Sequence, residues 1–349
     1  MECAPVKVRG GVGALLDFNA CIGVFLSFWL TMPFSFGTRD LWHYPVSIDI
    51  VLGVTGLFLG CCIPETPQYL LSMKKDASAA KKSLRFSHGS KENVDVILSE
   101  IQRSELTRSS ESEETQKLPR RKVISLLVLC TVIGSVPAAS CYQGLSAYTT
   151  PILTRAGIPE GTAQTMTLIM GFFEIICGAL SVYINQRSAR RSVLLSTASV
   201  MLIGNLALAI FLLLAKQYSN VTLAYAGGAV AYVLAGCCVM GPYPLCPILP
   251  PELTPTYLRA KASASALSAF SVGDILIKLF LWPLFIAIDG YVFFIFAALT
   301  LACIAYLWKF LPETHPKFTV KSKSNRISPT QPKPTNYGTI TTDDREFPQ

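Results

Sequence analysis

Long apolar stretches alternate with short polar connections along the chain. Eight stretches of about 20 residues carry few charges, and each would cross a hydrocarbon layer of ~30 Å as a helix. None shows the alternation of a barrel strand. The pattern therefore predicts an all-α polytopic membrane protein with about eight transmembrane helices, at 11–33, 45–64, 124–146, 162–184, 193–215, 222–249, 262–288 and 290–311.

Composition and charge placement support this prediction. Hydrophobic residues make up 51% of the 349 residues and charged residues only 15%, which leaves too little polar surface for a soluble fold. The net charge of +8 does not indicate a nucleic-acid partner, because 26 of the 30 Lys and Arg lie in alternate connections. This bias predicts that the start, the loop 72–122 and the tail are cytoplasmic, with membrane lipid as the surroundings.

Other residue patterns add little chemistry. The eleven cysteines lie in or beside apolar segments, without zinc or disulfide spacing, and are expected to be small core residues. Asn220 begins a glycosylation sequon on the expected outer face. The sequence has no phosphate loop, nucleophile constellation or metal-ligand set, so we expect neither an enzyme nor a cofactor or metal site.

Two motifs recur at nearly the same offset. The pattern Glu2-x-x-Pro5-x-x-x-Arg9 returns 250 residues later, at Glu252, and Pro64-Glu65-Thr66 returns 248 residues later, at Pro312. The first two helices therefore correspond to the last two of a six-helix half, and transporters are often built from such repeated halves. We expect about four further helices to precede Met1 in the complete architecture.

Five motifs follow one another along the chain: Glu2-x-x-Pro5-x-x-x-Arg9-Gly10, Pro64-Glu65-Thr66-Pro67, Gln186-Arg187-Ser188-Ala189-Arg190-Arg191, Gly241-Pro242-Tyr243-Pro244 and Pro312-Glu313-Thr314. On these motifs, in this order, the chain resembles the sugar-transporter branch of the major facilitator superfamily, which contains glucose and trehalose carriers. The resemblance implies alternating-access transport.

The resemblance also implies a cytoplasmic latch, in which bidentate Arg–carboxylate pairs hold one half against the other. Alternatively, these arginines only set the topology. The expected acceptors and donors are Glu2, Glu65, Glu252 and Glu313, and Arg9, Arg187, Arg190, Arg191 and Arg259.

Substrate residues are expected where spans are interrupted or carry polar groups. The segment 222–249 cannot be a straight helix, because it contains Gly241 and several prolines. Asp274 and Lys278 are four residues apart and are expected to pair. Asp17 and Glu174 would each accept hydrogen bonds from the hydroxyl groups of a substrate or carry a proton. Alternatively, they are protonated residues that serve packing. The candidate binding residues are Asp17, Gln143, Tyr148, Glu174, Tyr243 and Asp274.

One region departs from the family pattern. Pro137-Ala138 stands where the resemblance implies a Gln-Gln pair, Gln143 where it implies Asn, and only Tyr148 of an aromatic pair is present. These differences weaken the case for glucose or trehalose as the substrate. Gln143, Tyr148 and their neighbours still supply hydrogen-bonding groups for a polar solute, or else serve interhelical packing.

Four segments are expected: two helices in 1–71, a cytoplasmic loop with short helices in 72–122, a six-helix half in 123–317 and a disordered tail in 318–349. Asp76 is positioned to cap a short loop helix. The favoured function is facilitated diffusion of a small polar solute, expected to be a sugar, across the plasma membrane. The alternatives are a proton-coupled carrier of another solute, and a shortened protein that regulates a full-length carrier.

Overall fold

The computed structural model describes residues 9–72, 74–88, 94, 97–99, 101 and 119–312. These residues form helices joined by short turns, with no strand among them. The helices are α1 (Arg9–Leu30), α2 (His43–Cys62), α3 (Pro67–Ser72), α4 (Ala77–His88), α6 (Arg120–Ala139), α7 (Tyr142–Arg155), α8 (Glu160–Arg187), α9 (Arg190–Tyr218), α10 (Val221–Met240), α11 (Pro242–Leu253), η1 (Thr256–Leu258), α12 (Arg259–Ile288), η2 (Asp289–Tyr291) and α13 (Val292–Phe310).

The described part of the chain contains six stretches that are long and apolar enough to cross a membrane. One of them, Arg259–Phe310, contains two helices, α12 and α13, and α1 adds the shorter apolar segment Phe18–Leu30. The result is eight helical crossings, as the apolar pattern predicts. One expected span is not continuous, because the segment 124–146 is divided between α6 and α7.

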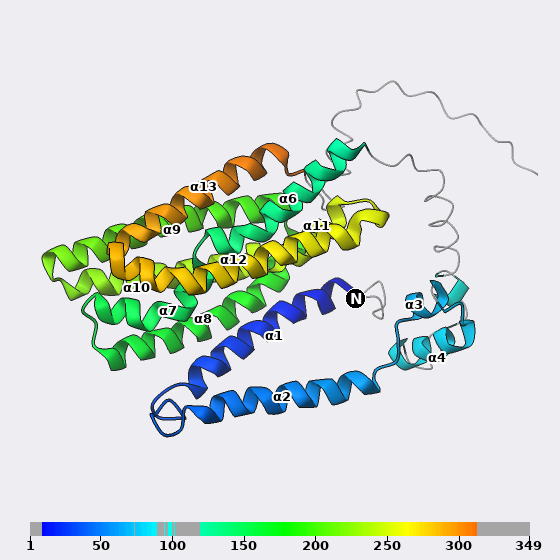
Figure 1. Cartoon of the computed structure of the whole chain (residues 1–349), viewed down its shortest axis with the longest axis horizontal. Helices are drawn as coiled ribbons and strands as arrows, with labels where there is room; N and C mark the ends of the chain where they lie inside the picture. The colour runs from blue at the N-terminus through cyan, green and yellow to red at the C-terminus, as the bar shows by residue number, and fades with distance from the viewer. Residues whose placement is uncertain are drawn as a thin grey trace, which may run out of the picture.

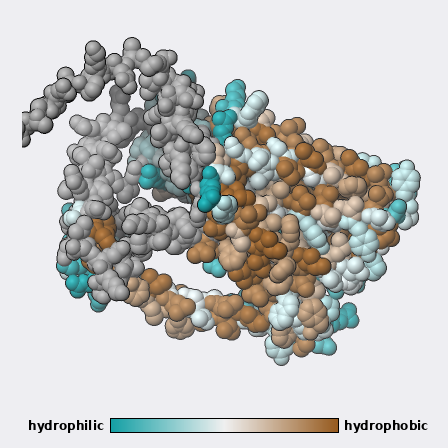
Figure 2. Space-filling view, turned by 180° about the vertical axis from the view of Figure 1, so that it is seen from behind, coloured by the Kyte–Doolittle hydropathy of each residue, from teal (hydrophilic) through white to brown (hydrophobic). Residues whose placement is uncertain are grey.

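Six of these crossings form one bundle, and the first two lie at its side (Figure 1). Within the bundle, α9 packs against α10 and α13, and α6 packs against α12. Helix α1 joins the bundle through α8, whereas α2 lies outermost and buries none of its side chains. Apolar residues cover much of the face seen in Figure 2, as expected of a surface that contacts lipid.

Small residues bring α6 and α12 close together. A Cβ atom at Gly134 on α6 would overlap the backbone carbonyl of Ala266 on α12, and Ala262 and Ala266 are fully buried. Small side chains let helix backbones approach closely, which is how helices associate in lipid. The run of small residues that opens α12 serves this packing.

The cysteines only partly match their expected place. Cys21, Cys130, Cys177 and five others that include Cys141 and Cys238 are free thiols, most of them buried, but Cys61 and Cys62 are exposed on α2. The expectation that all eleven are core residues is therefore wrong for these two. Both lie on α2, none of whose side chains is buried.

One short helix after the second span, α4, begins as predicted. The Asp76 carboxylate accepts hydrogen bonds from the backbone N–H groups of Ser78 and Ala79, both at 3.0 Å, and so caps α4. These bonds, that of Ala79 first, lower the pKa of Asp76 below its usual value of 3.8. The expected second loop helix lies largely outside the described residues, and the tail from 318 lies entirely outside them.

Candidate functional site

The break between α6 and α7 lies deep in the bundle. Cys141 has a φ of 63°, in the left-handed region that few non-glycine residues adopt, and it separates the two helices. The carbonyl oxygens freed by the break find side-chain donors on other helices. Asn205 Nδ2 on α9 donates to Ser140 O at 3.1 Å, and Thr300 Oγ1 on α13 donates to Ala139 O at 2.9 Å.

A second break divides α10 from α11 at Gly241. A Cβ atom at Gly241 would overlap the side chain of Thr197 on α9. The close approach of this break to α9 therefore requires glycine. The freed carbonyl oxygen of Met240 accepts a hydrogen bond from Asn185 Nδ2 at 3.1 Å. The structure thus confirms that the segment 222–249 is interrupted, and it shows that both interruptions are stabilised in the same way.

Buried polar groups gather beside the first break. Gln143 on α7 is 6% exposed and Glu174 on α8 is 1% exposed. Helix α7 packs against α8 here, and Tyr142 on α7 belongs to a buried cluster against which Tyr243 on α11 packs. Neither Glu174 oxygen, nor Gln143 Oε1, has a partner in hydrogen-bond geometry among the described residues. Unpaired buried acceptors are costly, and a ligand that brings donors would satisfy them.

A second group of predicted residues lies on α12 and the facing part of α7. Lys278 Nζ lies 2.9 Å from Asp274 Oδ1, which confirms the expected pairing. The Tyr148 hydroxyl donates to the carbonyl oxygen of Lys278 at 2.7 Å, and its ring stacks on Trp282 at 5.7 Å between centroids. Tyr148 therefore ties α7 to α12. Tyr243 makes an edge contact with Phe270 of α12, with centroids 5.4 Å apart.

The first helix carries the remaining candidate binding residue. Asp17 lies in α1, but its side chain is outside the described part of the structure. Since α1 packs against α8, the helix that carries Glu174, α1 borders the same region.

The arginine motif lies at the end of the bundle where α8 meets α9. Arg190 Nη1 lies 3.0 Å from Glu252 Oε1, and Arg191 Nη2 donates to Trp308 O at 2.7 Å. The Arg187 guanidinium lies 4.6 Å from the Tyr183 ring centroid. These contacts join α9 to α11 and α13 within the six-helix half.

Other members of the expected latch show less. The side chains of Glu65 and Arg259 are exposed. The side chain of Arg9, together with Glu2 and Glu313, lies outside the described residues.

The opposite end of the bundle carries a charge cluster that the sequence did not predict. Asp289, in the turn between α12 and α13, pairs with Arg155 on α7 at 3.2 Å and with Lys216 on α9. Arg155 and Lys216 are two of the few cations outside the basic connections, so the pairing accounts for their position. Asn220 lies at the same end and caps α10, since its Oδ1 accepts from Thr222 N at 2.9 Å.

Sequence reasoning missed several residues that shape the site. Asn185 and Asn205 each donate a hydrogen bond to a backbone carbonyl oxygen at one of the two helix breaks. Trp282 packs against Tyr148. The available signal was an amide inside an apolar span, which is costly in lipid and therefore usually paired. Such a signal marks the residue but not its partner.

Comparison with known proteins agrees with this architecture. A family model described as sugar (and other) transporter matches residues 1–323. The facilitated glucose transporter member 9 of Pongo abelii is 28% identical over 349 residues, which cover 95% of this chain and 59% of that protein. Human member 5 is also 28% identical and is covered to 67%. The chain thus spans about three fifths of the length of the first of these relatives.

Solved structures show the same fold. The proton:xylose symporter XylE, a major facilitator superfamily protein bound to 6-bromo-6-deoxy-D-glucose, superposes with a TM-score of 0.66. It is 20% identical, over 90% of this chain and 66% of that one. The relatives are named as transporters, in keeping with the expectation that the chain is not an enzyme. The family model matches most of the chain, and the protein belongs to the sugar (and other) transporter family, with a major facilitator fold.

Proposed function

We propose that this protein moves a sugar across the membrane by facilitated diffusion with alternating access. One observation carries the proposal: the broken helices α6–α7 and α10–α11 meet around buried, incompletely paired polar groups of Gln143 and Glu174. Interrupted helices with polar side chains at mid-depth are typical of transporter substrate sites. The relatives named as glucose transporters and as a xylose symporter support sugar as the class of substrate.

The chemistry suits a neutral hydroxylated solute. Gln143 presents an amide that donates and accepts, Glu174 presents two acceptors, and the Tyr142 hydroxyl does both. Gln143, Tyr148, Glu174, Tyr243 and Asp274, with Asp17 on α1, are the proposed binding residues. Movement would use the two helix breaks as hinges. The cytoplasmic end would be held closed by the Arg190–Glu252 pair and by the other arginines and glutamates of the expected latch.

Uptake into proteoliposomes tests the proposal. The purified chain is reconstituted and labelled D-glucose, D-fructose and D-xylose are offered separately. Saturable uptake of at least one sugar is expected, and Gln143→Leu should lower it about tenfold or more because an amide hydrogen bond to the substrate is lost. Ser199→Ala is the control, since within the described part of the chain this hydroxyl bonds only to Leu195 O of its own helix. Absence of saturable uptake of every sugar would contradict the proposal.

Proton-coupled transport is the second candidate. It is favoured by Glu174, a carboxylate that is 1% exposed and has no cationic partner among the described residues. A charge at this depth costs about 3 kcal/mol, and a proton would remove it. Under this mechanism an inward proton gradient accelerates uptake, and Glu174→Gln abolishes the acceleration. Uptake that is independent of the gradient would eliminate proton coupling.

The third candidate is a protein that does not transport alone but regulates a full-length carrier. Helix α2, which exposes an apolar surface on all sides, offers a face for such a partner. Co-expression with a full-length relative would change that relative's uptake under this hypothesis. Unchanged uptake by the relative would exclude it.

We also propose a plasma-membrane location with both termini in the cytoplasm. The concentration of Lys and Arg in alternate connections supports the orientation of the termini. Epitope tags at each end, probed before and after permeabilisation of intact cells, test the orientation. Access to either tag without permeabilisation would contradict it.

A further inference from the structure

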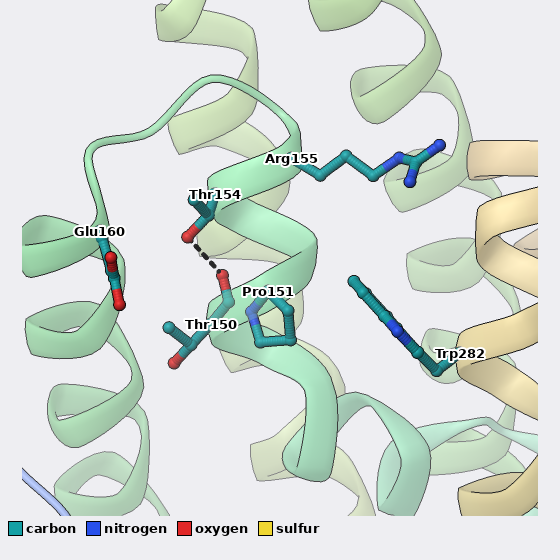
Figure 3. A pocket seen from close by; sticks show the side chains of 6 residues that line it. All are labelled: Thr150, Pro151, Thr154, Arg155, Glu160 and Trp282. Carbon is teal, nitrogen blue, oxygen red and sulfur yellow. Dashed lines mark hydrogen bonds between the residues drawn. The ribbon is translucent and has the colours of Figure 1, made fainter. Parts of the chain in front are cut away.

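An open pocket of about 490 Å³ lies at the end of the bundle that carries the Asp289 cluster. It lies over the last turns of α7, with the start of α8 on one side and α12 on the other (Figure 3). Its volume is within the ~300–1,000 Å³ typical of small-molecule sites. The lining residues are Thr150, Pro151, Thr154, Arg155, Glu160 and Trp282. Along α7 they begin seven residues beyond Gln143, or roughly 10 Å at ~1.5 Å per residue, so the pocket is separate from the buried group.

Trp282 is a rigid apolar wall of this pocket. Its ring stacks with Tyr148 at 5.7 Å and an interplanar angle of 16°, and with Phe285 at 6.1 Å and 23°. These contacts restrict the ring, and Figure 3 shows it across from Pro151. The indole N–H forms no hydrogen bond with another described residue. An aromatic ring with a free donor suits a ligand that has C–H surfaces and hydroxyl groups together.

The polar walls carry balanced charge. Arg155 Nε lies 3.2 Å from Asp289 Oδ1, and its Nη2 donates to Ile286 O at 3.4 Å, so the guanidinium is held in place. Lys216 pairs with the same aspartate, and Glu160 stands on the opposite wall. Of these charged residues, Arg155 and Glu160 line the pocket, one of each sign, so neither an anion nor a cation is favoured. The Thr150 and Thr154 hydroxyls add neutral hydrogen-bonding groups.

We propose that this pocket is a second binding site, an entry site for a neutral monosaccharide. The sugar's C–H face would lie on Trp282 while Thr154, Arg155 and Glu160 bond its hydroxyls. The choice of ligand class rests on the proposed function. Along α7, Tyr148 lies between Gln143 and the first pocket residue, Thr150, and its ring contacts Trp282 of the pocket.

Tryptophan fluorescence tests this site directly. The chain has four tryptophans, and replacing Trp29, Trp42 and Trp308 by Phe leaves Trp282 as the only reporter. Titration of this protein in nanodiscs with D-glucose, D-fructose and D-xylose should give a saturable change with at least one sugar. A variant that keeps only Trp308 should give none. A change that is linear with every sugar, or equal in the Trp308 variant, would overturn the proposal.

A matched pair of threonines sharpens the test. Thr154→Val should raise the half-saturating sugar concentration about fivefold, which corresponds to the loss of one hydrogen bond of about 1 kcal/mol. Thr165→Val is the control, because Thr165 on α8 is also exposed and bonds its own helix at Gly161 O, but does not line the pocket. Glu160→Gln should also weaken binding. Equal affinity of the Thr154, Glu160 and Thr165 variants would overturn the proposal.

The outcome separates this site from the transport function. Gln143→Leu should lower uptake about tenfold or more but leave the Trp282 titration unchanged. A saturable Trp282 response without any uptake would retain the pocket and reject transport. Saturable uptake without a Trp282 response would reject the pocket alone.

Discussion

Asn205 on α9 donates a hydrogen bond from Nδ2 to the carbonyl oxygen of Ser140, 65 residues earlier, at 3.1 Å. Ser140 immediately precedes the residue that breaks α6 from α7, and both partners are fully buried. Backbone carbonyls at this depth cannot bond to water, so the amide replaces the missing helical donor. Asn185 does the same for Met240 at the second break.

We expect Asn205→Leu to destabilise the protein by about 1–3 kcal/mol, because it leaves the Ser140 carbonyl unpaired in an apolar environment. Thermal unfolding in detergent, followed by tryptophan fluorescence, should show a lower midpoint. Ser199→Ala on the same helix should leave the midpoint nearly unchanged, since among the residues that the structure describes its hydroxyl bonds only within α9. Equal midpoints for the two variants would show that the amide does not stabilise the break.

The Asp274–Lys278 pair predicts a difference between single and double substitutions. Lys278→Met leaves the Asp274 carboxylate without its cation inside a span, where an unpaired charge costs about 3 kcal/mol. Asp274→Asn with Lys278→Met removes both charges and should be the more stable variant. Unfolding midpoints of the two proteins measure the difference. A double variant less stable than the single would contradict this account of the pair.

Arg190→Gln should loosen the basic end by removing the bond to Glu252. A cysteine introduced at Ser188, in the turn between α8 and α9, reports accessibility to a membrane-impermeant maleimide. We expect labelling about three- to tenfold faster, the equivalent of roughly 1 kcal/mol for a partly buried ion pair. Lys261→Gln, which removes an exposed positive charge at the same end, is the control. Identical labelling rates in the two backgrounds would rule out a latch role for Arg190.

The Asn220 sequon can be separated from the Asn220 helix cap. Thr222→Ala destroys the sequon but keeps the cap, because Asn220 bonds the backbone N–H of residue 222. Asn220→Gln destroys both and should lower stability by about 1 kcal/mol. If the sequon is used in cells, both variants lose a glycosidase-sensitive shift on a gel, but only Asn220→Gln unfolds earlier. Absence of that shift from the unmodified protein would show that the sequon is unused.

The Asp76 cap gives a prediction about pH. The pKa of Asp76 is lowered by hydrogen bonds that form only in the folded state, so its contribution is present at neutral pH and lost as pH falls through the folded value, below 3.8. Asp76→Ala should therefore accelerate hydrogen exchange in α4 at neutral pH. Asp76→Asn should restore most of the protection, because an amide oxygen also accepts. Equal exchange in all three proteins would show that the cap does not order α4.

Local features of the sequence determined much of this protein. Hydrophobic length predicted the eight crossings, and the proline and glycine content of 222–249 predicted its interruption. The spacing of Asp274 and Lys278 predicted their pair, and Asp76 was recognised as a cap. Each of these features depends on residues within one or two helical turns, so the pattern along the chain contains the necessary information.

The tertiary structure alone decided which distant residues meet. Arg155 and Asp289 are separated by 134 positions, and nothing near either one marks its partner. The break at Cys141 is likewise absent from the local pattern, because a non-glycine residue adopts this conformation only when surrounding contacts, such as that of Asn205, compensate its cost. Helix packing brings these residues together, so the pattern along the sequence does not predict the contacts between them.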